Sequence, residues 1–147
     1  MVQIKGAGRF RKFLSGLTTK LLALTDIRGR PAALKLTLGQ AHDLSAVDDL
    51  IEAVPPDTIM LADKAYDTDD FIDALNERQI CPNIPNKANR KEPRGFFKSL
   101  YKHRNQIERF FGKLKHFRRV ATRYEKRADN YLAMCELASA RVIMRDL

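Results

Sequence analysis

Cysteine is scarce in this sequence, since only Cys81 and Cys135 occur and they stand far apart. Two isolated cysteines are too few for a disulfide framework or a zinc site. The sequence also lacks an apolar run of the ~18 residues that a membrane-spanning helix requires. Residues 1–6 carry no secretory signal. These absences argue against secreted, membrane-spanning and disulfide-stabilised proteins and favour the reducing cytoplasm.

Acidic residues are scarce where basic residues are most abundant. Residues 84–127 hold 15 of the 27 Lys and Arg residues but only three of the 18 Asp and Glu residues. The net charge of +9 is therefore concentrated in one segment of a 147-residue chain, which is long enough for one domain. Such a segment favours a polyanionic partner such as DNA. It has no long apolar face for a membrane, and a basic surface that only maintains solubility is the alternative.

The hydrophobic pattern predicts an α/β fold. Apolar residues at 21–25 and alternating apolar residues at 33–38, joined by a turn at Gly29, predict an antiparallel hairpin. The apolar run at 58–62 is typical of a strand buried on both faces of a parallel sheet, and the prolines within 80–85 indicate an edge strand. Helical spacing predicts helices over 44–54, after a cap at Thr68 or Asp67, over 97–120 and over 128–145.

Asp63 directly follows the predicted buried strand. Ligands of open α/β sheets bind beyond the carboxyl ends of the strands. A carboxylate at this place suits a hard cation such as Mg²⁺ or Mn²⁺, which prefers oxygen ligands. The alternative is that Asp63 only caps the turn that follows it.

A single stripe of the predicted helix over 97–120 carries Tyr101, Arg104, Glu108 and Lys115. At about 100° per residue, these four side chains fall within an arc of about 60°. One carboxylate flanked by two cations and a phenol is an arrangement suited to phosphate binding. The alternative is an ordinary surface helix on which Arg104 and Glu108 form a stabilising pair four residues apart.

Three sequence features together resemble one protein family. They are Asp-Lys-Ala-Tyr-Asp at 63–67, Gly-Gln-Ala-His-Asp at 39–43, and the spacing Tyr-x-x-Arg-x-x-x-Glu-x-x-x-x-x-x-Lys that starts at Tyr101. This combination resembles the catalytic domain of DDE transposases of bacterial insertion sequences, in its C-terminal portion, from about residue 17 to residue 140. The resemblance implies a ribonuclease-H-like fold, DNA as partner, and a bacterial cytoplasmic protein. It also implies cleavage and transfer of DNA strands by Mg²⁺ or Mn²⁺.

The resemblance also implies a role for each residue of the candidate site. Asp63 and Glu108 correspond to the second and third acidic residues, which are catalytic and bind the metal ions. Tyr101, Arg104 and Lys115 correspond to residues that contact the phosphates of the transposon end. His42, in the segment at 39–43, is either a group that supports the site or the cap of the next helix.

The sequence departs from the family at its start. The family's first acidic residue lies on a strand before the hairpin, and residues 1–20 contain no acidic residue. We therefore predict that residues 1–20 form a basic, poorly ordered arm and that residues 21–147 form a partial DDE catalytic domain. This would be an incomplete ribonuclease-H-like domain without its first central strand. With two of three carboxylates, its metal site would bind weakly.

These observations leave three hypotheses for the function. The first is the C-terminal part of a DDE transposase, inactive alone, which either acts with another transposase chain or the product of an upstream reading frame or is a decayed remnant. The second is a non-catalytic DNA-binding or regulatory fragment of a transposase. The third is a stand-alone Mg²⁺ nuclease, and the absent acidic residue argues against it.

Overall fold

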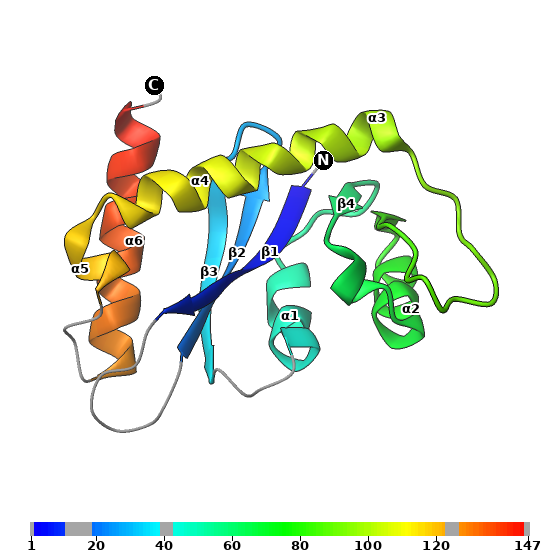
Figure 1. The fold of residues 1–147 in the computed structure, drawn as a ribbon, viewed down its shortest axis with the longest axis horizontal. Helices are drawn as coiled ribbons and strands as arrows, with labels where there is room; N and C mark the ends of the chain where they lie inside the picture. Colours follow the sequence, from blue (N-terminus) through cyan, green and yellow to red (C-terminus); the bar gives the residue numbers. More distant parts are fainter. Residues whose placement is uncertain (1, 11–18, 39–42, 123–126, 146–147) are drawn as a thin grey trace.

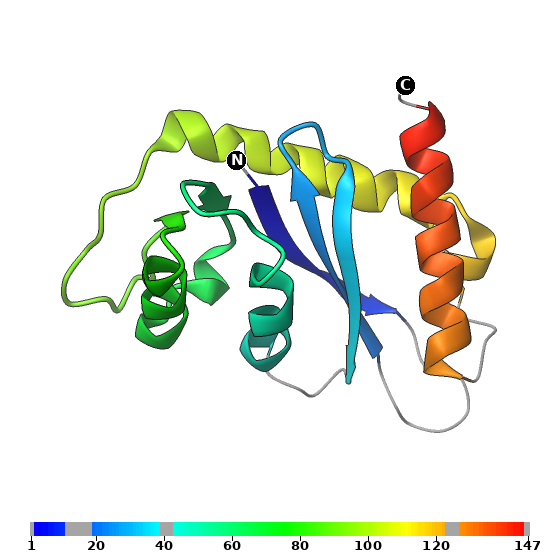
Figure 2. The same cartoon turned by 180° about the vertical axis from the view of Figure 1, so that it is seen from behind.

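Five strands form one mixed sheet, and helices cover both of its faces (Figures 1 and 2). The computed structural model describes residues 2–10, 19–38, 43–122 and 127–145. The strand order is β3-β2-β1-β4-β5. The strands are β1 (Val2–Phe10), β2 (Thr19–Asp26), β3 (Pro31–Leu38), β4 (Ile59–Leu61) and β5 (Cys81–Asn83). The α-helices are α1 (Asp43–Ile51), α2 (Asp69–Glu77), α3 (Lys98–Tyr101), α4 (Asn105–Lys115), α5 (Arg118–Ala121) and α6 (Ala128–Arg145), and the 3₁₀ turns are η1 (Lys64–Tyr66) and η2 (Lys102–Arg104).

The centre of the sheet is β1, and this corrects two predictions. Residues 2–10 are a strand within the sheet rather than a poorly ordered arm, and the central strand is present rather than missing. The strand β1 pairs antiparallel with β2 and parallel with β4. Without it, the inner edges of β2 and β4 would carry unpaired backbone groups, which are costly when buried. Its glycines made it look irregular, and the register shift between Ala7 and Phe10 spans Gly8.

The core lies on both faces of the sheet because β2 is buried on both sides. Leu22 and Leu24 pack with α1 and α2, whereas Leu21 and Ala23 pack with α4, α5 and α6. Successive side chains of a strand point to opposite faces, so the unbroken apolar run serves two layers at once. This arrangement supports the predicted α/β fold with an antiparallel hairpin and parallel strands flanked by helices.

Asp26 and Gly29 determine the hairpin turn between β2 and β3. The Asp26 carboxylate accepts the backbone N–H groups of Arg28 and Arg30, both at 2.9 Å. Gly29 has the positive φ of 79° that its turn position predicts. A Cβ atom on Gly29 would lie 2.9 Å from the carbonyl oxygen of Gln106. The turn therefore packs closely against the first residues of α4.

The prediction of one continuous helix over 97–120 is wrong. The chain forms α3, then the 3₁₀ turn η2, then α4, which ends at Lys115, and then the short helix α5. The 3₁₀ turn changes the rotation per residue, so positions on the two sides of it cannot be placed by helical spacing alone. The predicted helix over 128–145 is confirmed as α6.

The shorter predicted elements are confirmed with small changes of boundary. The run at 58–62 contains β4, which pairs parallel with β5 at one edge of the sheet. Thr68 caps α2, since its side chain accepts the N–H of Phe71. His42 and the rest of 39–42 lie outside the described residues. None of the helices that the structure describes is long and apolar enough to cross a membrane.

Candidate active site

Asp63 stands just beyond the carboxyl end of β4, as its sequence position predicts. The strand β4 ends in the fully buried pair Met60 and Leu61, and its apolar side chains fix the place at which the chain emerges. Asp63 precedes the 3₁₀ turn η1, but its side chain makes no capping hydrogen bond there. The reading of Asp63 as a turn cap is therefore not supported. Its carboxylate is directed to a different part of the chain.

Arg104 joins the two candidate acidic residues. Its Nη1 atom lies 2.6 Å from Oδ1 of Asp63, and its Nη2 atom lies 2.6 Å from Oε1 of Glu108. The Arg104–Glu108 pair is thus the predicted pair four residues apart, but Asp63, from a distant part of the sequence, completes it. The structure therefore brings Asp63 and Glu108 to the two sides of one guanidinium group.

Tyr101 completes this cluster. The Arg104 guanidinium carbon lies 5.4 Å from the centre of the Tyr101 ring, a cation–π arrangement. Phe96 packs edge-on against the same ring at 5.1 Å. Burial raises the pKa of the Tyr101 phenol. The Arg104 charge lowers that pKa, whereas the charges of Asp63 and Glu108 and the phenol's hydrogen bond to Asp63 raise it.

Lys115 is the one candidate residue that stands apart. It is exposed at the last position of α4, seven residues beyond Glu108. Seven residues of α-helix span about 10 Å along the axis. Tyr101, Arg104, Glu108 and Asp63 therefore form one cluster, and Lys115 lies along the same helix at a distance from it.

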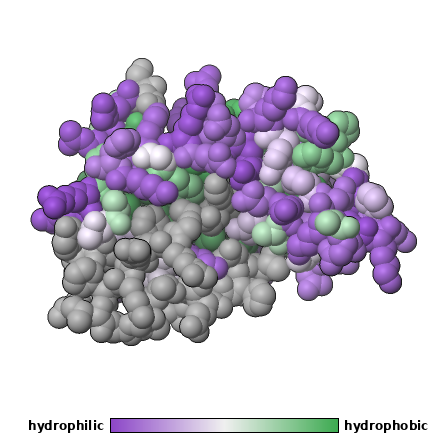
Figure 3. Space-filling view, in the orientation of Figure 1, coloured by the Kyte–Doolittle hydropathy of each residue, from purple (hydrophilic) through white to green (hydrophobic). Residues whose placement is uncertain are grey.

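The apolar face of α4 holds the cluster against the sheet. Ile107, Phe110, Phe111 and Leu114 are buried in the core layer that also contains Leu21 of β2. The opposite face carries exposed basic residues, and hydrophilic side chains extend over α3 and α4 in the space-filling view (Figure 3). The exposed Lys and Arg residues of α3, η2, α4 and α5 are Lys98, Lys102, Arg109, Lys113, Lys115, Arg118 and Arg119.

The two carboxylates have the donor chemistry of a divalent cation site. Carboxylate oxygens from Asp63 and Glu108 converge on the place that the Arg104 guanidinium now takes. Arg104 Nη1 is buried and has no hydrogen bond of good geometry, despite its short contact with Asp63. Among the described residues, no group of three or more His, Cys, Asp or Glu side chains converges on one place. The arrangement fits one cation held by two carboxylates once Arg104 has moved aside.

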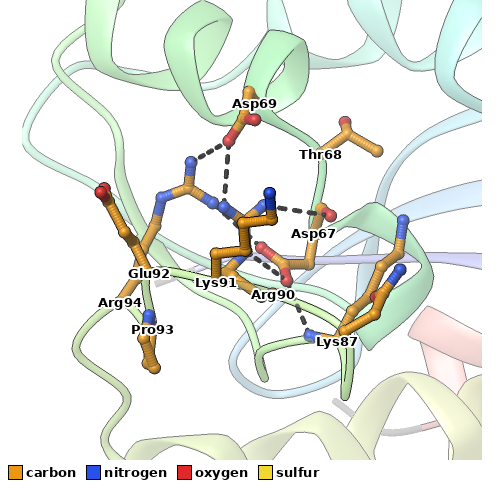
Figure 4. Close-up of a pocket in the computed structure, with 10 residues that line it drawn as sticks. Asp67, Thr68, Asp69, Lys87, Arg90, Lys91, Glu92, Pro93 and Arg94 are labelled. Atoms are coloured by element: carbon orange, nitrogen blue, oxygen red, sulfur yellow. Dashed lines mark hydrogen bonds and ion pairs between the residues drawn. The ribbon is translucent and has the colours of Figure 1, made fainter.

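A second charged cluster, which the sequence did not reveal, fixes the loop between β5 and α3 (Figure 4). The Asp67 side chain is 2% exposed and accepts Nε of Arg90 at 2.7 Å, Nη1 of Arg94 at 3.0 Å and the backbone N–H of Lys87 at 2.7 Å. Both arginines also pair with Asp69. Burial raises the pKa of Asp67, but these hydrogen bonds and charges outweigh it and hold that pKa below its usual value.

Two asparagines close the same loop. Asn83 donates to the carbonyl of Phe97 at 3.1 Å and accepts its N–H at 2.8 Å. Asn86 forms the same double contact with Arg94, at 3.0 and 2.9 Å. Each side-chain amide thus makes the pair of hydrogen bonds with a backbone that a neighbouring strand would make. The loop is therefore fastened at several points before the chain enters α3, the helix that carries Tyr101.

Known proteins resemble this chain along almost its whole length. The sequence model of the Transposase DDE domain matches residues 3–143. A putative transposase for insertion sequence element IS6501 of Brucella ovis is 36% identical over 132 residues, which are 88% of this chain and 100% of that protein. A putative transposase for insertion sequence element IS402 of Burkholderia cepacia is 33% identical over 135 residues, which are 84% of this chain and 62% of that protein.

A solved structure shares the fold. A chain of the simian T-cell lymphotropic virus intasome, in complex with PP2A regulatory subunit B56 gamma, superposes with a TM-score of 0.60. It is 14% identical in sequence, and the match covers 94% of this chain and 46% of that chain. At this identity the likeness concerns the fold alone. Together with the match over residues 3–143, the sequence relatives show that the chain belongs to the family of DDE transposase domains from bacterial insertion sequences.

Proposed function

We propose that this chain is part of a ribonuclease-H-like transposase domain that cleaves and transfers DNA strands at the ends of an insertion sequence. The observation that carries the proposal is the convergence of Asp63 and Glu108 on Arg104. Family membership supports the proposed reaction class, and this geometry supports the proposed place of the site within the chain. We also propose that the partner is DNA and that the reaction takes place in the bacterial cytoplasm.

Asp63 and Glu108 are the proposed catalytic carboxylates, and they would hold Mg²⁺ or Mn²⁺. A cation held there would supply charge stabilisation at the phosphate and a more reactive attacking oxygen. The chain itself positions the two carboxylates. Asp63 is placed by the buried end of β4, and Glu108 is placed by the apolar face of α4.

Tyr101, Arg104 and Lys115 are the proposed DNA-binding residues. A guanidinium group contacts a phosphate through two parallel hydrogen bonds, whereas an ammonium group acts as a point charge. Arg104 is held by Asp63 and Glu108 in the absence of DNA. A phosphate that enters the site would offer this guanidinium new acceptors, and Asp63 and Glu108 are the residues that would hold the cation.

The chain is expected to be inactive by itself. Asp63 and Glu108 are not joined by a third acidic residue within the part of the chain that the structure describes. Two carboxylates bind a divalent cation weakly, and a paired-metal reaction needs further ligands. We therefore infer that another transposase chain, or the product of an upstream reading frame, contributes to the complete site.

Plasmid nicking tests this proposal. The wild-type chain should leave supercoiled DNA intact in the presence of Mn²⁺. The parallel register pairs Gln3 of β1 with Leu61 of β4, and Lys5 and Asp63 each follow two residues after this pair. The variant Lys5→Asp adds a carboxylate on the neighbouring strand at this level. It should bind Mn²⁺ more tightly and nick the plasmid, and Lys5→Asp combined with Glu108→Gln should not nick it.

Two results would count against the proposal. Nicking by the wild-type chain that is lost in Glu108→Gln would mean that the chain is complete by itself. Equal Mn²⁺ affinity of Lys5→Asp and wild type, both folded, would mean that the cation is not held beside Asp63. Circular dichroism of each variant provides the control for folding.

A non-catalytic DNA-binding or regulatory fragment is the second candidate function. It is favoured by Arg104, which neutralises both carboxylates within the chain itself. Such a fragment would compete with an intact transposase for DNA and would not need either carboxylate. The double variant Asp63→Asn, Glu108→Gln would then inhibit transposition by the intact protein as strongly as the wild-type chain does.

A further inference from the structure

The helix α6 has two apolar faces, and only one of them belongs to the core. Its inner face carries Tyr131, Cys135, Ala138 and Val142, all buried against α4 and α5. The Tyr131 hydroxyl also donates to the carbonyl of Val120 at 2.9 Å. This face is sufficient to anchor the helix to the domain.

The outer face of α6 carries a second row of apolar residues. Ala133, Leu137, Ala140 and Met144 are all exposed, and 66% of both Leu137 and Met144 is accessible to solvent. Their spacing of four, three and four residues is the spacing of the inward-facing positions of a coiled coil. Leu137 and Met144 also border a hollow of about 620 Å³ between α5 and α6. We define Ala133, Leu137, Ala140 and Met144 as the outer seam.

Charged residues flank the outer seam with opposite signs on its two sides. Glu136 lies about 100° to one side of Leu137 around the helix, and Arg141 lies about 40° to the other side. In a parallel pair of helices, a residue at the position of Glu136 faces a residue five positions later on the partner, which is Arg141. In an antiparallel pair, Glu136 would face Glu136 and Arg141 would face Arg141. The charges of this helix are therefore complementary to a second copy of itself in parallel orientation.

We propose that the outer seam of α6 binds the outer seam of a second copy of this chain, in parallel orientation about a twofold axis. Figure 2 shows α6 along one side of the molecule, and its outer-seam residues Leu137 and Met144 are exposed to solvent. Ala133 and Ala140 allow the two helices to approach closely, and Leu137 and Met144 provide the apolar contact. The pairing requires neither metal nor a complete active site.

The pairing is expected to be weak and dependent on concentration. The seam has about two heptads, fewer than an isolated coiled coil needs. Two features compensate for this shortness. The helix is already formed and anchored by its inner face, so pairing does not have to order it. A DNA molecule that binds two copies would also raise their effective concentration.

Cysteine cross-linking tests both the contact and its orientation. In a Cys81→Ser background, which removes the exposed native thiol, Ala133→Cys and Ala140→Cys each place a cysteine on the seam. In a parallel pair, equal positions face each other at a distance that a disulfide can span. Each variant should therefore form a disulfide with itself. Asp73→Cys, exposed on the distant helix α2, is the matched control and should stay monomeric.

The other outcomes overturn the proposal. Cross-linking only in a mixture of Ala133→Cys with Met144→Cys would mean an antiparallel pair. No cross-link at any protein concentration, with both variants folded, would mean that the seam is covered by something other than a second copy.

Charge exchange gives an independent readout by sedimentation velocity. Glu136→Arg and Arg141→Glu should each weaken self-association by roughly three- to tenfold, since each creates two repulsive contacts across the twofold axis. The double exchange should restore wild-type association. Equal weakening in the double variant would contradict the parallel arrangement.

Discussion

Arg104 is the central residue of the proposed site. It contacts Asp63, Glu108 and the Tyr101 ring at once. Asp63 is 34% exposed and Glu108 is 42% exposed, so solvent screens both ion pairs. Exposed pairs of this kind contribute up to ~1 kcal/mol each. The guanidinium group is therefore held firmly enough to define the site and weakly enough to be displaced.

Lys115 differs from Arg104 because its side chain is exposed at the end of α4, away from the two carboxylates. Lys115→Gln is expected to weaken DNA binding about equally for every sequence, because an ammonium group that contacts a phosphate reads no base. Loss of one phosphate contact should reduce the slope of log affinity against log salt concentration by about one.

Fluorescence anisotropy over a series of salt concentrations measures this change. Arg78→Gln, which removes one charge at the end of α2, is the control and should leave the slope unchanged. A loss of affinity confined to one DNA sequence, or an unchanged slope, would contradict the phosphate contact.

At the scale of elements, the loop between β5 and α3 depends on the Asp67 cluster. Asp67→Asn removes a buried charge that faces Arg90 and Arg94. Removal of one partner of a buried pair costs ~3–5 kcal/mol. We expect about 2–3 kcal/mol of lost stability, because Asp69 still pairs with both arginines. Thermal and urea unfolding measure this difference, with Asp73→Asn, an exposed position in α2, as control.

The pH dependence of the same difference has a definite sign. The pKa of Asp67 is lowered in the folded protein. The stability that its charge contributes is therefore complete above the unfolded pKa of about 3.9 and is lost as the pH falls through the folded pKa. The gap between wild type and Asp67→Asn should narrow below about pH 4. A gap that stays constant down to pH 2.5 would contradict the ionised cluster.

The elements that periodicity could predict are those with a strong apolar pattern. The hairpin strands β2 and β3 and the helix α6 carry clear patterns, and each was predicted near its observed place. The strand β1 was missed because its sequence is rich in glycine and basic residues. It forms a strand because its backbone pairs with β2 on one side and β4 on the other. The hydrophobic pattern of one sequence does not show which strands will pair.

The candidate site was partly predictable for a related reason. The positions of Asp63 after a strand and of Tyr101, Arg104 and Glu108 along one helical region are local features, and the structure brings these four together. The Asp67 cluster joins residues more than 20 positions apart. The local sequence does not predict such a contact, because a charged residue in a basic loop has the same sequence context whether its side chain is exposed or paired.

At the scale of the whole molecule, the sheet and the helical layer act as a frame for two carboxylates. The strand β4 positions Asp63 at the end of the sheet, and the helix α4 positions Glu108 in the helical layer that packs on the sheet. The hairpin turn at Gly29 packs against Gln106, two residues before Glu108. The site therefore depends on the complete fold, and a cation that binds both carboxylates should stabilise the folded chain as a whole.

The shift of the unfolding temperature by Mn²⁺ tests this account most directly. At about ten times its dissociation constant, a cation bound only to the folded state adds about 1.4 kcal/mol, or a shift of roughly 3–6 °C. We predict this shift for the wild type, a larger shift for Arg104→Gln at the same Mn²⁺ concentration, and none for Asp63→Asn. Asp73→Asn, which leaves the site intact, should respond as the wild type does. An equal shift in Asp63→Asn, or no shift in wild type and Arg104→Gln, would contradict a cation site between Asp63 and Glu108.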